Sequence, residues 1–496
     1  MNLFAQQSVL LVGLGESGLA CARWALAQGA ALTIVDSRLE PPGLTALRAE
    51  AAEVNCLQSV AGVPWAFQRV VVSPGLPPSH PVMVEVIELA NQHNTPVESE
   101  LDWFADALEA LGREQAYHPK VIGVTGTNGK TTTVRMVECL ARYAGLNTRA
   151  AGNISPAALA SLLDALNSED LPAVWVLELS SFQLHWTSRL PLDASVVLNL
   201  TQDHLDWHKD QAEYANDKAR IFTHSKVAVL NRDDSVVKNM SVPGTAKALT
   251  FGLNAPTSPG DFGLIREGGM LWLSNMPAGT EATTPKRRKD ADAEVTTAQL
   301  LMPADALQVV GLHNAGNALA ALALCQAIDL PMAKLLHGLR TYKGEPHRVE
   351  WVAQVEGVDY FDDSKGTNVG ATVAALQGLQ RTCVLIAGGE GKGQDFRELI
   401  GPVSSFACAV LLIGKAAAEL QVLFAGLGVP TEVCASLEET VPKAHQRALE
   451  HAGGATPCVL LSPACASLDM FRNYAHRADV FVSAVHELAA DRGQPC

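Results

Sequence analysis

The chain has 496 residues, of which 48% are hydrophobic and 18% charged, a composition typical of a compact soluble protein with about three domains. No apolar run approaches the roughly 20 residues that cross a bilayer, which excludes a membrane-spanning protein. The net charge of −15 disfavours nucleic acid as a partner, so an anionic substrate must be bound by loops, helix ends or metal ions.

Residues 1–115 are predicted to form a first domain of alternating strands and helices. Buried strands are expected at residues 8–12 and 31–35 and within residues 69–77, where the strand closes on a Ser-Pro-Gly turn, with a helix near residues 18–28. Such alternation builds a parallel sheet and favours a Rossmann-like fold. The start of the chain lacks a signal-type segment, and the ten cysteines form no C-x-x-C pair. We therefore expect a cytoplasmic protein with reduced thiols.

A glycine-rich turn, GLGESG at residues 13–18, follows the first strand and opens the helix, and Asp36 follows the second strand. This is the layout of dinucleotide-binding domains, in which phosphates lie at the helix N-terminus. Three interpretations stay open from these residues alone: a redox dinucleotide, a nucleotide-linked substrate, or a purely structural turn. The absence of an evident hydride-transfer constellation favours the second.

The second domain, predicted over residues 116–340, opens with KVIGVTGTNGKTTT at residues 120–133, which reads as a strand, a glycine-rich loop and a helix. In a P-loop, backbone N–H groups point at phosphate oxygens, the lysine reaches the β and γ phosphates, and a hydroxyl binds magnesium. The usual first glycine is displaced, because Val124 occupies its place. Lysine at a helix N-terminus is unfavourable without an anion, so we expect a bound polyphosphate. The candidate ATP-binding residues are Gly126, Thr127, Asn128, Gly129, Lys130, Thr131 and Thr132.

Further strands are predicted at residues 173–179, 194–200 and 226–230, and an alanine-rich helix near residues 314–328. Glu178 ends the first of these strands, at the sheet edge where ligands collect, and is a candidate magnesium ligand. Asp203, His204 and Asp206 follow the next strand as further polar candidates or as a surface turn of helix-capping acids. The polar segment 279–299 is predicted to be a solvated loop.

A third domain is predicted over residues 341–496, because the apolar runs at 383–387, 409–413 and 458–461 again alternate with helices. The predicted fold class is therefore α/β, with three domains. They are an N-terminal Rossmann-like domain, a central P-loop ATPase domain with a mostly parallel sheet, and a C-terminal Rossmann-like domain.

Seven segments, spread in order over essentially the whole chain, together resemble the Mur ligases. They are TGTNGKTTT (125–133), ELSSFQL (178–184), DHLD (203–206), HNAGNALAALAL (313–324), the His347–Arg348 pair, DDSKGTN (362–368) and SPACASLDMF (462–471). The resemblance implies one domain for a UDP-sugar, one for ATP and one for an incoming amino acid. It also implies an ATP-dependent ligase that adds D-glutamate to UDP-N-acetylmuramoyl-L-alanine through an acyl phosphate, in peptidoglycan precursor synthesis.

The same resemblance implies which residues bind each substrate. The UDP substrate is expected at Gly15, Glu16, Ser17, Asp36, Ser37, Arg38, Gly75, Asn153, Ser180 and Gln183, which disfavours the redox interpretation. ATP is expected to contact, besides the P-loop, Asn314, Asn317, Arg348, Asp363 and Lys365. D-glutamate is expected to contact Thr367, Lys392, Ser467, Leu468 and Tyr474. Lys392 would supply a cation for the second carboxylate of glutamate.

The catalytic residues implied by the resemblance are Lys130, Glu178, His204 and Lys218. Two Mg²⁺ ions are expected, with Thr131, Glu178, His204 and Lys218 as ligands. The resemblance further implies that Lys218 is carbamylated, although its place on a charged helix would otherwise indicate a solvated face. The enzyme is expected to act as a monomer, on small-molecule substrates, without nucleic-acid or membrane partners.

Related ligases and a regulatory protein are the alternatives. Relatives that add diaminopimelate or lysine carry an Asn-Pro-Arg signature that is missing here, and those that add L-alanine typically place histidine where Asn128 stands. Folylpolyglutamate synthetases share a similar ATP loop but lack the GLGESG start. A nucleotide-binding regulator would keep the P-loop and need no amino-acid pocket.

Overall fold

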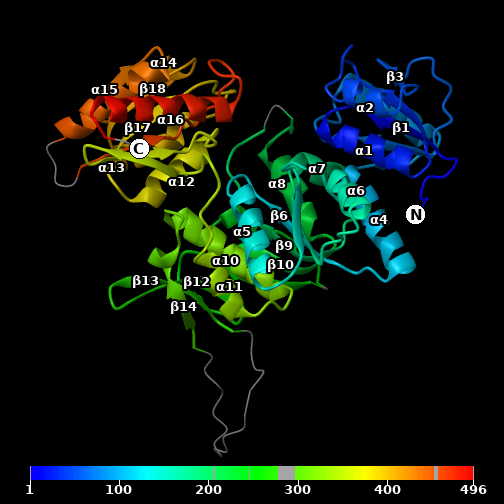
Figure 1. Ribbon diagram of the computed structural model, residues 1–496, viewed down its shortest axis with the longest axis horizontal. Coiled ribbons are helices and arrows are strands. Elements are labelled where there is room, and N and C mark those ends of the chain that lie inside the picture. The colour runs from blue at the N-terminus through cyan, green and yellow to red at the C-terminus, as the bar shows by residue number, and fades with distance from the viewer. Residues whose placement is uncertain (1, 205–206, 245, 278–296, 452–455, 495–496) are drawn as a thin grey trace, which may run out of the picture.

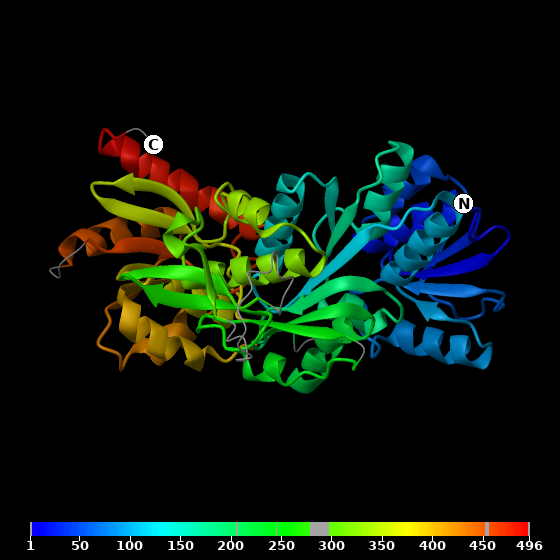
Figure 2. The ribbon, with the colours of Figure 1, turned by 90° about the horizontal axis from the view of Figure 1, so that it is seen from below.

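The computed structural model describes residues 2–204, 207–244, 246–277, 297–451 and 456–494. Within these residues, three β-sheets flanked by helices divide the chain into three successive α/β domains, which confirms the predicted fold class. Figure 1 shows the first domain in blue and the third in yellow to red, above opposite ends of the central domain. Figure 2 shows the three in a row, with the central domain in the middle. The boundaries after residues 115 and 340 stay predictions.

The first domain is a parallel sheet in the order β3-β2-β1-β4-β5. Its elements are β1 (Ser8–Val12), α1 (Glu16–Ala27), β2 (Ala31–Val35), α2 (Leu44–Glu50), β3 (Asn55–Leu57), β4 (Arg69–Val72), α3 (Pro81–Gln92), β5 (Val97–Glu98) and α4 (Glu100–Gln115). The turn between β1 and α1 is tight, because a Cβ atom on Gly18 would lie 2.1 Å from the carbonyl oxygen of Gly13. Only glycine lets α1 pack this closely against the turn.

The central sheet runs in the order β14-β13-β12-β11-β10-β9-β6-β8-β7. It is parallel from β7 to β12 and antiparallel at the β12–β13–β14 edge, in agreement with the predicted mostly parallel sheet. Its elements are β6 (Lys120–Thr125), α5 (Lys130–Tyr143), β7 (Thr148–Gly152), α6 (Ala158–Asn167), β8 (Val174–Glu178), α7 (Ser181–Trp186), β9 (Leu192–Val197), α8 (Gln211–Ala219), β10 (Ser225–Asn231), α9 (Ser235–Lys238), β11 (Lys247–Phe251), β12 (Asp261–Glu267), β13 (Met270–Asn275), β14 (Gln299–Pro303), α10 (Leu312–Ala327) and α11 (Met332–Leu339). The predicted loop at residues 279–299 lies outside the described residues as far as residue 296.

The third domain has the sheet order β15-β16-β20-β17-β18-β19, in which β15 and β16 pair antiparallel and the other strands pair parallel. Its elements are β15 (Glu350–Val355), β16 (Val358–Asp362), α12 (Val369–Leu379), β17 (Cys383–Gly388), α13 (Ile400–Phe406), β18 (Ala407–Ile413), α14 (Ala417–Phe424), β19 (Thr431–Val433), α15 (Leu437–Glu450), β20 (Cys458–Leu461) and α16 (Tyr474–Asp491). Apolar side chains fill both faces of this sheet.

Buried carboxylates join the first domain to the central domain. Arg189, which follows α7, pairs with Glu98 at 2.5 Å, and its backbone N–H donates to Asp102 at 2.8 Å. Glu100 accepts the backbone N–H of Leu159, in the first turn of α6, at 2.9 Å. Because all three carboxylates are almost fully buried, these contacts fix one domain against the other.

The nine cysteines that the structure describes are free thiols, as predicted, and Cys496 lies outside the described residues. In the described part of the chain, no helix is both long and apolar enough to cross a membrane.

Candidate active site

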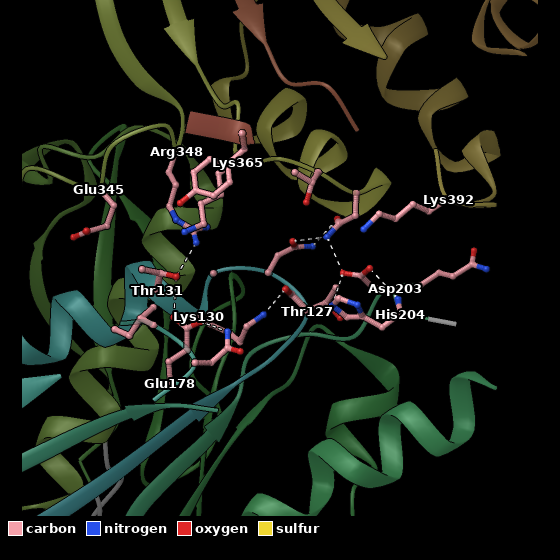
Figure 3. Close-up of a pocket in the computed structure, with 18 of the residues that line it drawn as sticks. Thr127, Lys130, Thr131, Glu178, Asp203, His204, Glu345, Arg348, Lys365 and Lys392 are labelled. Atoms are coloured by element: carbon pink, nitrogen blue, oxygen red, sulfur yellow. Dashed lines mark hydrogen bonds and ion pairs between the residues drawn. The ribbon is translucent and has the colours of Figure 1, made fainter. Parts of the chain in front are cut away.

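A cavity of about 660 Å³ is lined by residues of the central and third domains (Figure 3). The central domain contributes Thr127, Asn128, Gly129, Lys130, Thr131, Arg135, Asn153, Ile154, Ser155, Glu178, Gln202, Asp203 and His204. The segments beyond α11 contribute Glu345, Arg348, Lys365, Thr367, Asn368, Lys392, Gly393, Gln394 and Tyr474. The cavity therefore brings together predicted residues from segments that are more than 200 positions apart.

The P-loop lies between β6 and α5 at the base of this cavity. Gly126 and Gly129 adopt positive φ angles of 152° and 84°, which suit glycine and turn the loop around its centre. The Lys130 ammonium donates to the carbonyl oxygens of Gly126 and Thr127, at 2.8 Å each. A Cβ atom on Gly129 would lie 2.5 Å from the side-chain oxygen of Asn317, so α10 packs directly against the loop.

A chain of polar contacts runs from α5 to β7 past the end of β8. Thr131 donates through its hydroxyl to Glu178 at 2.8 Å, and Asn153 donates to the other oxygen of the same carboxylate at 2.8 Å. Arg348, from the segment that enters the third domain, donates to the Thr131 hydroxyl oxygen at 2.8 Å. Figure 3 shows Arg348 reaching toward Thr131 across the cavity. The site thus has an oxygen-rich cluster with a guanidinium beside it.

Lys218 lies on α8, behind the P-loop, and does not line the cavity. Its side chain is buried, its Nζ donates to the Gly126 carbonyl at 3.0 Å, and the same atom stands 4.6 Å from the centre of the Tyr214 ring. Burial, reinforced by the nearby Lys130 ammonium, holds the pKa of Lys218 well below its usual value. The neutral amine is therefore far more available here than on a surface lysine.

Asp203 and His204 stand on the side of the cavity that faces Lys392 (Figure 3). The His204 ring packs edge-on against Phe182, with centroids 4.8 Å apart. The backbone N–H of His204 donates to Asp203 at 2.9 Å. Asp206, the further candidate of this segment, lies outside the described residues.

Three predicted D-glutamate contacts line the cavity: Thr367, Lys392 and Tyr474. The Lys365 ammonium lies 4.9 Å above the centre of the Tyr474 ring, a cation–π arrangement. Ser467 and Leu468 do not line this cavity, and the Leu468 side chain is exposed on the surface.

Three predicted ATP contacts are buried beside the cavity rather than along it: Asn314, Asn317 and Asp363. Asn317 donates to Asn314 at 3.2 Å on α10. Burial raises the pKa of Asp363 to about 7, although a hydrogen bond from Ser462 at 2.7 Å favours its ionised form. Gly126 and Thr132 are also absent from the lining residues.

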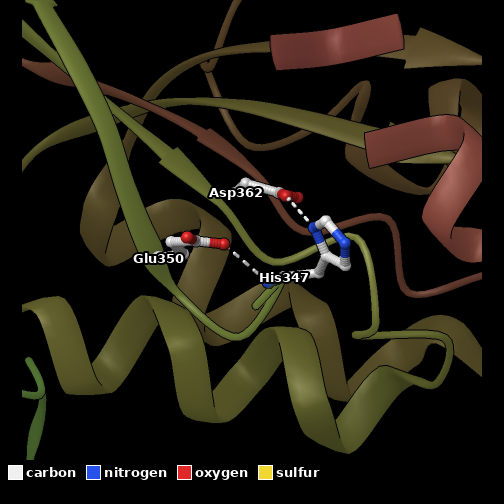
Figure 4. Close-up of side chains that lie close together, drawn as sticks. All are labelled: His347, Glu350 and Asp362. Carbon is white, nitrogen blue, oxygen red and sulfur yellow. Dashed lines mark hydrogen bonds and ion pairs between the residues drawn. The ribbon is translucent and has the colours of Figure 1, made fainter. Parts of the chain in front are cut away.

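His347, Glu350 and Asp362 cluster where the chain enters the third domain (Figure 4). The His347 ring meets the Asp362 carboxylate at 2.7 Å, and the His347 backbone N–H donates to Glu350 at 2.8 Å. His347 and Val349 both have positive φ angles, 64° and 51°, so the backbone on each side of Arg348 is strained. The two carboxylates therefore hold a strained turn that directs Arg348 toward Thr131.

A second cavity of about 410 Å³ lies over the GLGESG turn in the first domain. Its lining includes the predicted residues Gly15, Asp36, Ser37, Arg38 and Gly75, but not Glu16 or Ser17. Asp36 accepts the backbone N–H of Leu14 at 2.8 Å and the Arg38 guanidinium at 2.7 Å. Burial opposes the ionisation of Asp36, but these hydrogen bonds outweigh it and lower its pKa to about 2.

Ser180 and Gln183 line neither cavity. They form the capping box at the start of α7, in which the Gln183 amide oxygen accepts the backbone N–H of Ser180 at 3.0 Å. Their position directly after β8 fixes the end of the strand that carries Glu178.

Arg135, Glu345, Asn368 and Gln394 line the main cavity and were not predicted. Asn368 ends the segment DDSKGTN, so its neighbours in the sequence already carried a signal. Arg135 lies on the exposed side of a helix pattern, where charge normally indicates solvent. Glu345 reaches the cavity only because of the domain arrangement.

Models of three Mur ligase domains match the chain in order. The MurD-like N-terminal domain matches residues 7–93, the middle domain residues 124–325, and the glutamate ligase domain residues 347–465. Proteins named UDP-N-acetylmuramoylalanine--D-glutamate ligase from Cupriavidus pinatubonensis and Burkholderia thailandensis are each 53% identical to this chain, over 98% of both sequences.

Solved structures share the fold at low sequence identity. MurF from Acinetobacter baumannii matches with a TM-score of 0.59 at 16% identity, over 97% of this chain and 92% of that one. UDP-N-acetylmuramate-alanine ligase MurC from Thermotoga maritima matches with a TM-score of 0.54 at 18% identity, over 97% and 100% respectively.

Proposed function

The chain belongs to the Mur ligase family, and from this premise we infer that it is the ATP-dependent ligase that adds D-glutamate to UDP-N-acetylmuramoyl-L-alanine in peptidoglycan precursor synthesis. The observation that carries the inference is the single cavity in which the P-loop faces the lysines of the third domain. An ATP-activated carboxyl group and an incoming amino acid can meet there.

The reaction needs activation because a carboxylate is a poor electrophile. Transfer of the γ-phosphoryl group of ATP to the L-alanyl carboxylate produces an acyl phosphate, which contains a good leaving group. Lys130, the P-loop N–H groups and Arg348, which lie around one cavity, would stabilise the phosphate charge during this transfer. The amine of D-glutamate then attacks the acyl carbon, loses a proton, and the tetrahedral intermediate expels phosphate.

Thr131, Glu178 and His204 are the residues that would hold magnesium at this site. The Thr131 hydroxyl and the Glu178 carboxylate, 2.8 Å apart, are the hard oxygen ligands that Mg²⁺ prefers. When bound, magnesium neutralises phosphate charge and orients the γ-phosphoryl group. We propose that two Mg²⁺ ions bind here, as the resemblance to the family implies.

Carbamylation of Lys218 would supply an anionic ligand. Its unprotonated Nζ can attack the carbon of CO₂ and release one proton, which gives a carbamate with one negative charge. The lowered pKa of Lys218 supports this step, because only the neutral amine is a nucleophile. The hydrogen bond of Nζ to Gly126 supports a position of the carbamate beside the P-loop.

The UDP moiety and D-glutamate are proposed to bind on opposite sides of the central domain. Gly15, Asp36, Ser37, Arg38 and Gly75 form the cavity proposed for the UDP moiety, with Glu16 and Ser17 in the adjoining turn. Asn153 would contact the acyl end, while Ser180 and Gln183 would shape it from behind.

Thr367, Lys392 and Tyr474 would hold D-glutamate, with Ser467 and Leu468 contributing only if the third domain changes its position. ATP would extend past Asn314, Asn317 and Asp363, and Lys365 would lie near its phosphates. We further propose that the enzyme works as a monomer in the cytoplasm, where its ATP is supplied.

Phosphate release tests the proposal. The purified protein is supplied with ATP, Mg²⁺ and UDP-N-acetylmuramoyl-L-alanine, and phosphate is measured with and without D-glutamate, with L-glutamate as the matched control. We expect sustained release only with D-glutamate. Phosphate release that depends on neither the acceptor nor the amino acid would contradict the ligase activity and favour a nucleotide-binding regulator.

A further inference from the structure

Two asparagines from different domains face each other at the edge of the main cavity. Asn128, in the P-loop, donates through Nδ2 to Oδ1 of Asn368 at 3.2 Å. Asn368, which immediately precedes α12, donates back through Nδ2 to Oδ1 of Asn128 at 3.1 Å. The two amides form a cyclic pair that joins the central domain to the third domain.

The hydrogen-bond network leaves one orientation for the Asn368 amide. Its Oδ1 also accepts the backbone N–H of Ala371 at 2.8 Å, as the N-cap of α12. Its Nδ2 must therefore face acceptors, and the second of these is Oδ2 of Asp203 at 3.3 Å. Reversing the amide would place Oδ1 of Asn368 against the carboxylate oxygen of Asp203, so the contacts require the orientation described.

Asn128 is in turn fixed within the central domain. The backbone N–H of Asn128 donates to Asn199 at 2.8 Å, and the Asn199 amide donates back to the Asn128 carbonyl at 3.0 Å. Asp203 adjoins the candidate metal ligand His204. A displacement of Asn368 is therefore transmitted to the P-loop and to the segment that carries His204.

The first turn of α12 packs on the same segment of the central domain. A Cβ atom on Gly370 would lie 2.6 Å from the hydroxyl oxygen of Thr201, so glycine is needed for this approach. Thr367 directly precedes Asn368 and lines the cavity with Lys365 and Lys392. The position of Asn368 thus helps to determine where these side chains stand relative to the P-loop.

We propose that Asn128, Asn368 and Asp203 form an interdomain latch that positions the amino-acid-binding side chains of the third domain over the ATP site. The role in D-glutamate binding rests on the proposed function. Asn128 and Asn368 act here as positioning residues. Breaking the latch frees the third domain while leaving the first-domain cavity intact, so the KM for D-glutamate should rise while binding of the UDP substrate stays unchanged.

A double-mutant cycle tests the coupling with Asn128→Ala and Asn368→Ser, the latter retaining a helix cap. Loss of the paired amide hydrogen bonds is expected to raise the KM for D-glutamate about tenfold in each single variant. The double variant is expected to match Asn368→Ser, because that substitution already removes the paired amide hydrogen bonds that Asn128→Ala removes. A multiplicative effect of about a hundredfold, or unchanged KM values, would overturn the latch.

Two controls separate the latch from general damage. Ser436→Ala removes the cap of α15 in the same domain, away from the cavity, and should leave the KM for D-glutamate unchanged. Direct calorimetric binding of the UDP substrate should be equal in wild type and in both single variants. A KM for D-glutamate raised equally by Ser436→Ala would also count against the latch.

Small-angle X-ray scattering decides the question without turnover. With ADP and Mg²⁺ present, Asn368→Ser should show a larger radius of gyration than wild type, and identical profiles would refute an interdomain latch. If wild-type protein shows no phosphate release that depends on D-glutamate, the proposed function is wrong. The scattering comparison would still test the latch in that case.

Discussion

Replacing Glu100 by glutamine should change how the stability of the protein depends on pH. Glu100 is buried between the first and central domains, where it accepts the backbone N–H of Leu159. Burial raises its pKa from the ordinary 4.5 to about 7, although hydrogen bonds from Leu159 and Ser17 work in the opposite direction. Folding therefore strengthens proton binding at this carboxyl group.

The sign and the size of the effect follow from linkage. Because the folded protein holds the proton more tightly, the contribution of Glu100 is greatest below the unfolded pKa and is lost as pH rises through the folded value. The full loss is about 3 kcal/mol at 1.36 kcal/mol for each tenfold change in proton affinity. About 2 kcal/mol of it falls between pH 5.5 and pH 8. Glutamine keeps the acceptor oxygen and does not titrate, so this part of the pH dependence should vanish.

Urea unfolding followed by tryptophan fluorescence measures the difference, at pH 5.5 and pH 8, in wild type and Glu100→Gln. The other groups that titrate in this range, such as His313 and Asp363, occur in both proteins and cancel in the comparison. Glu109→Gln, at an exposed position of α4, is the matched control and should follow wild type. A difference between wild type and Glu100→Gln that is the same at both pH values would refute the reasoning.

Four further substitutions test other parts of the structure. Lys130→Ala should abolish turnover and leave calorimetric binding of the UDP substrate nearly intact, so simultaneous loss of both would show that the two cavities are not separate sites. Lys218→Ala should lose activity that small added carboxylates partly restore, whereas failure of every such rescue would count against the carbamate. Gly18→Ala should weaken binding of the UDP substrate and lower the melting temperature, because its Cβ would meet the Gly13 carbonyl at 2.1 Å; a fully stable variant with unchanged affinity would contradict this packing. Arg189→Ala leaves Glu98 buried with Arg69 as its remaining cation and should cost about 2 kcal/mol of stability in urea unfolding, while a cost near zero would mean that the two domains are held by other contacts.

Strands that are short apolar runs followed by turn residues could be predicted from the sequence. The runs at 8–12, 31–35 and 120–125 match β1, β2 and β6 residue for residue. The antiparallel edge formed by β12 and β13 was missed, because DFGLIRE and MLWLSN mix polar and apolar residues. Gly268 and Gly269, which separate these two strands, were the available signal for a hairpin.

Site residues within one motif were predictable, and those that depend on domain placement were not. Lys130, Thr131 and Glu178 line the cavity because a strand end and a helix start place them there, and both can be read locally. Arg135 lies on the charged side of the α5 helix pattern and Glu345 in a polar segment between two domains, so neither position indicated a cavity. Leu468 belongs to a clear motif, but its side chain is exposed on the surface. Its distance from the P-loop depends on how the third domain is oriented, which the sequence does not indicate.

The strained turn around Arg348 makes the proposed nucleotide site a shared property of two domains. The guanidinium that meets Thr131 belongs to a turn held by Asp362 and Glu350, so a central domain separated from the third domain would lose this cation. Such a fragment would keep its loop for triphosphate yet lack part of the charge that hydrolysis requires. We therefore expect truncated or half-made copies of the chain to consume little ATP.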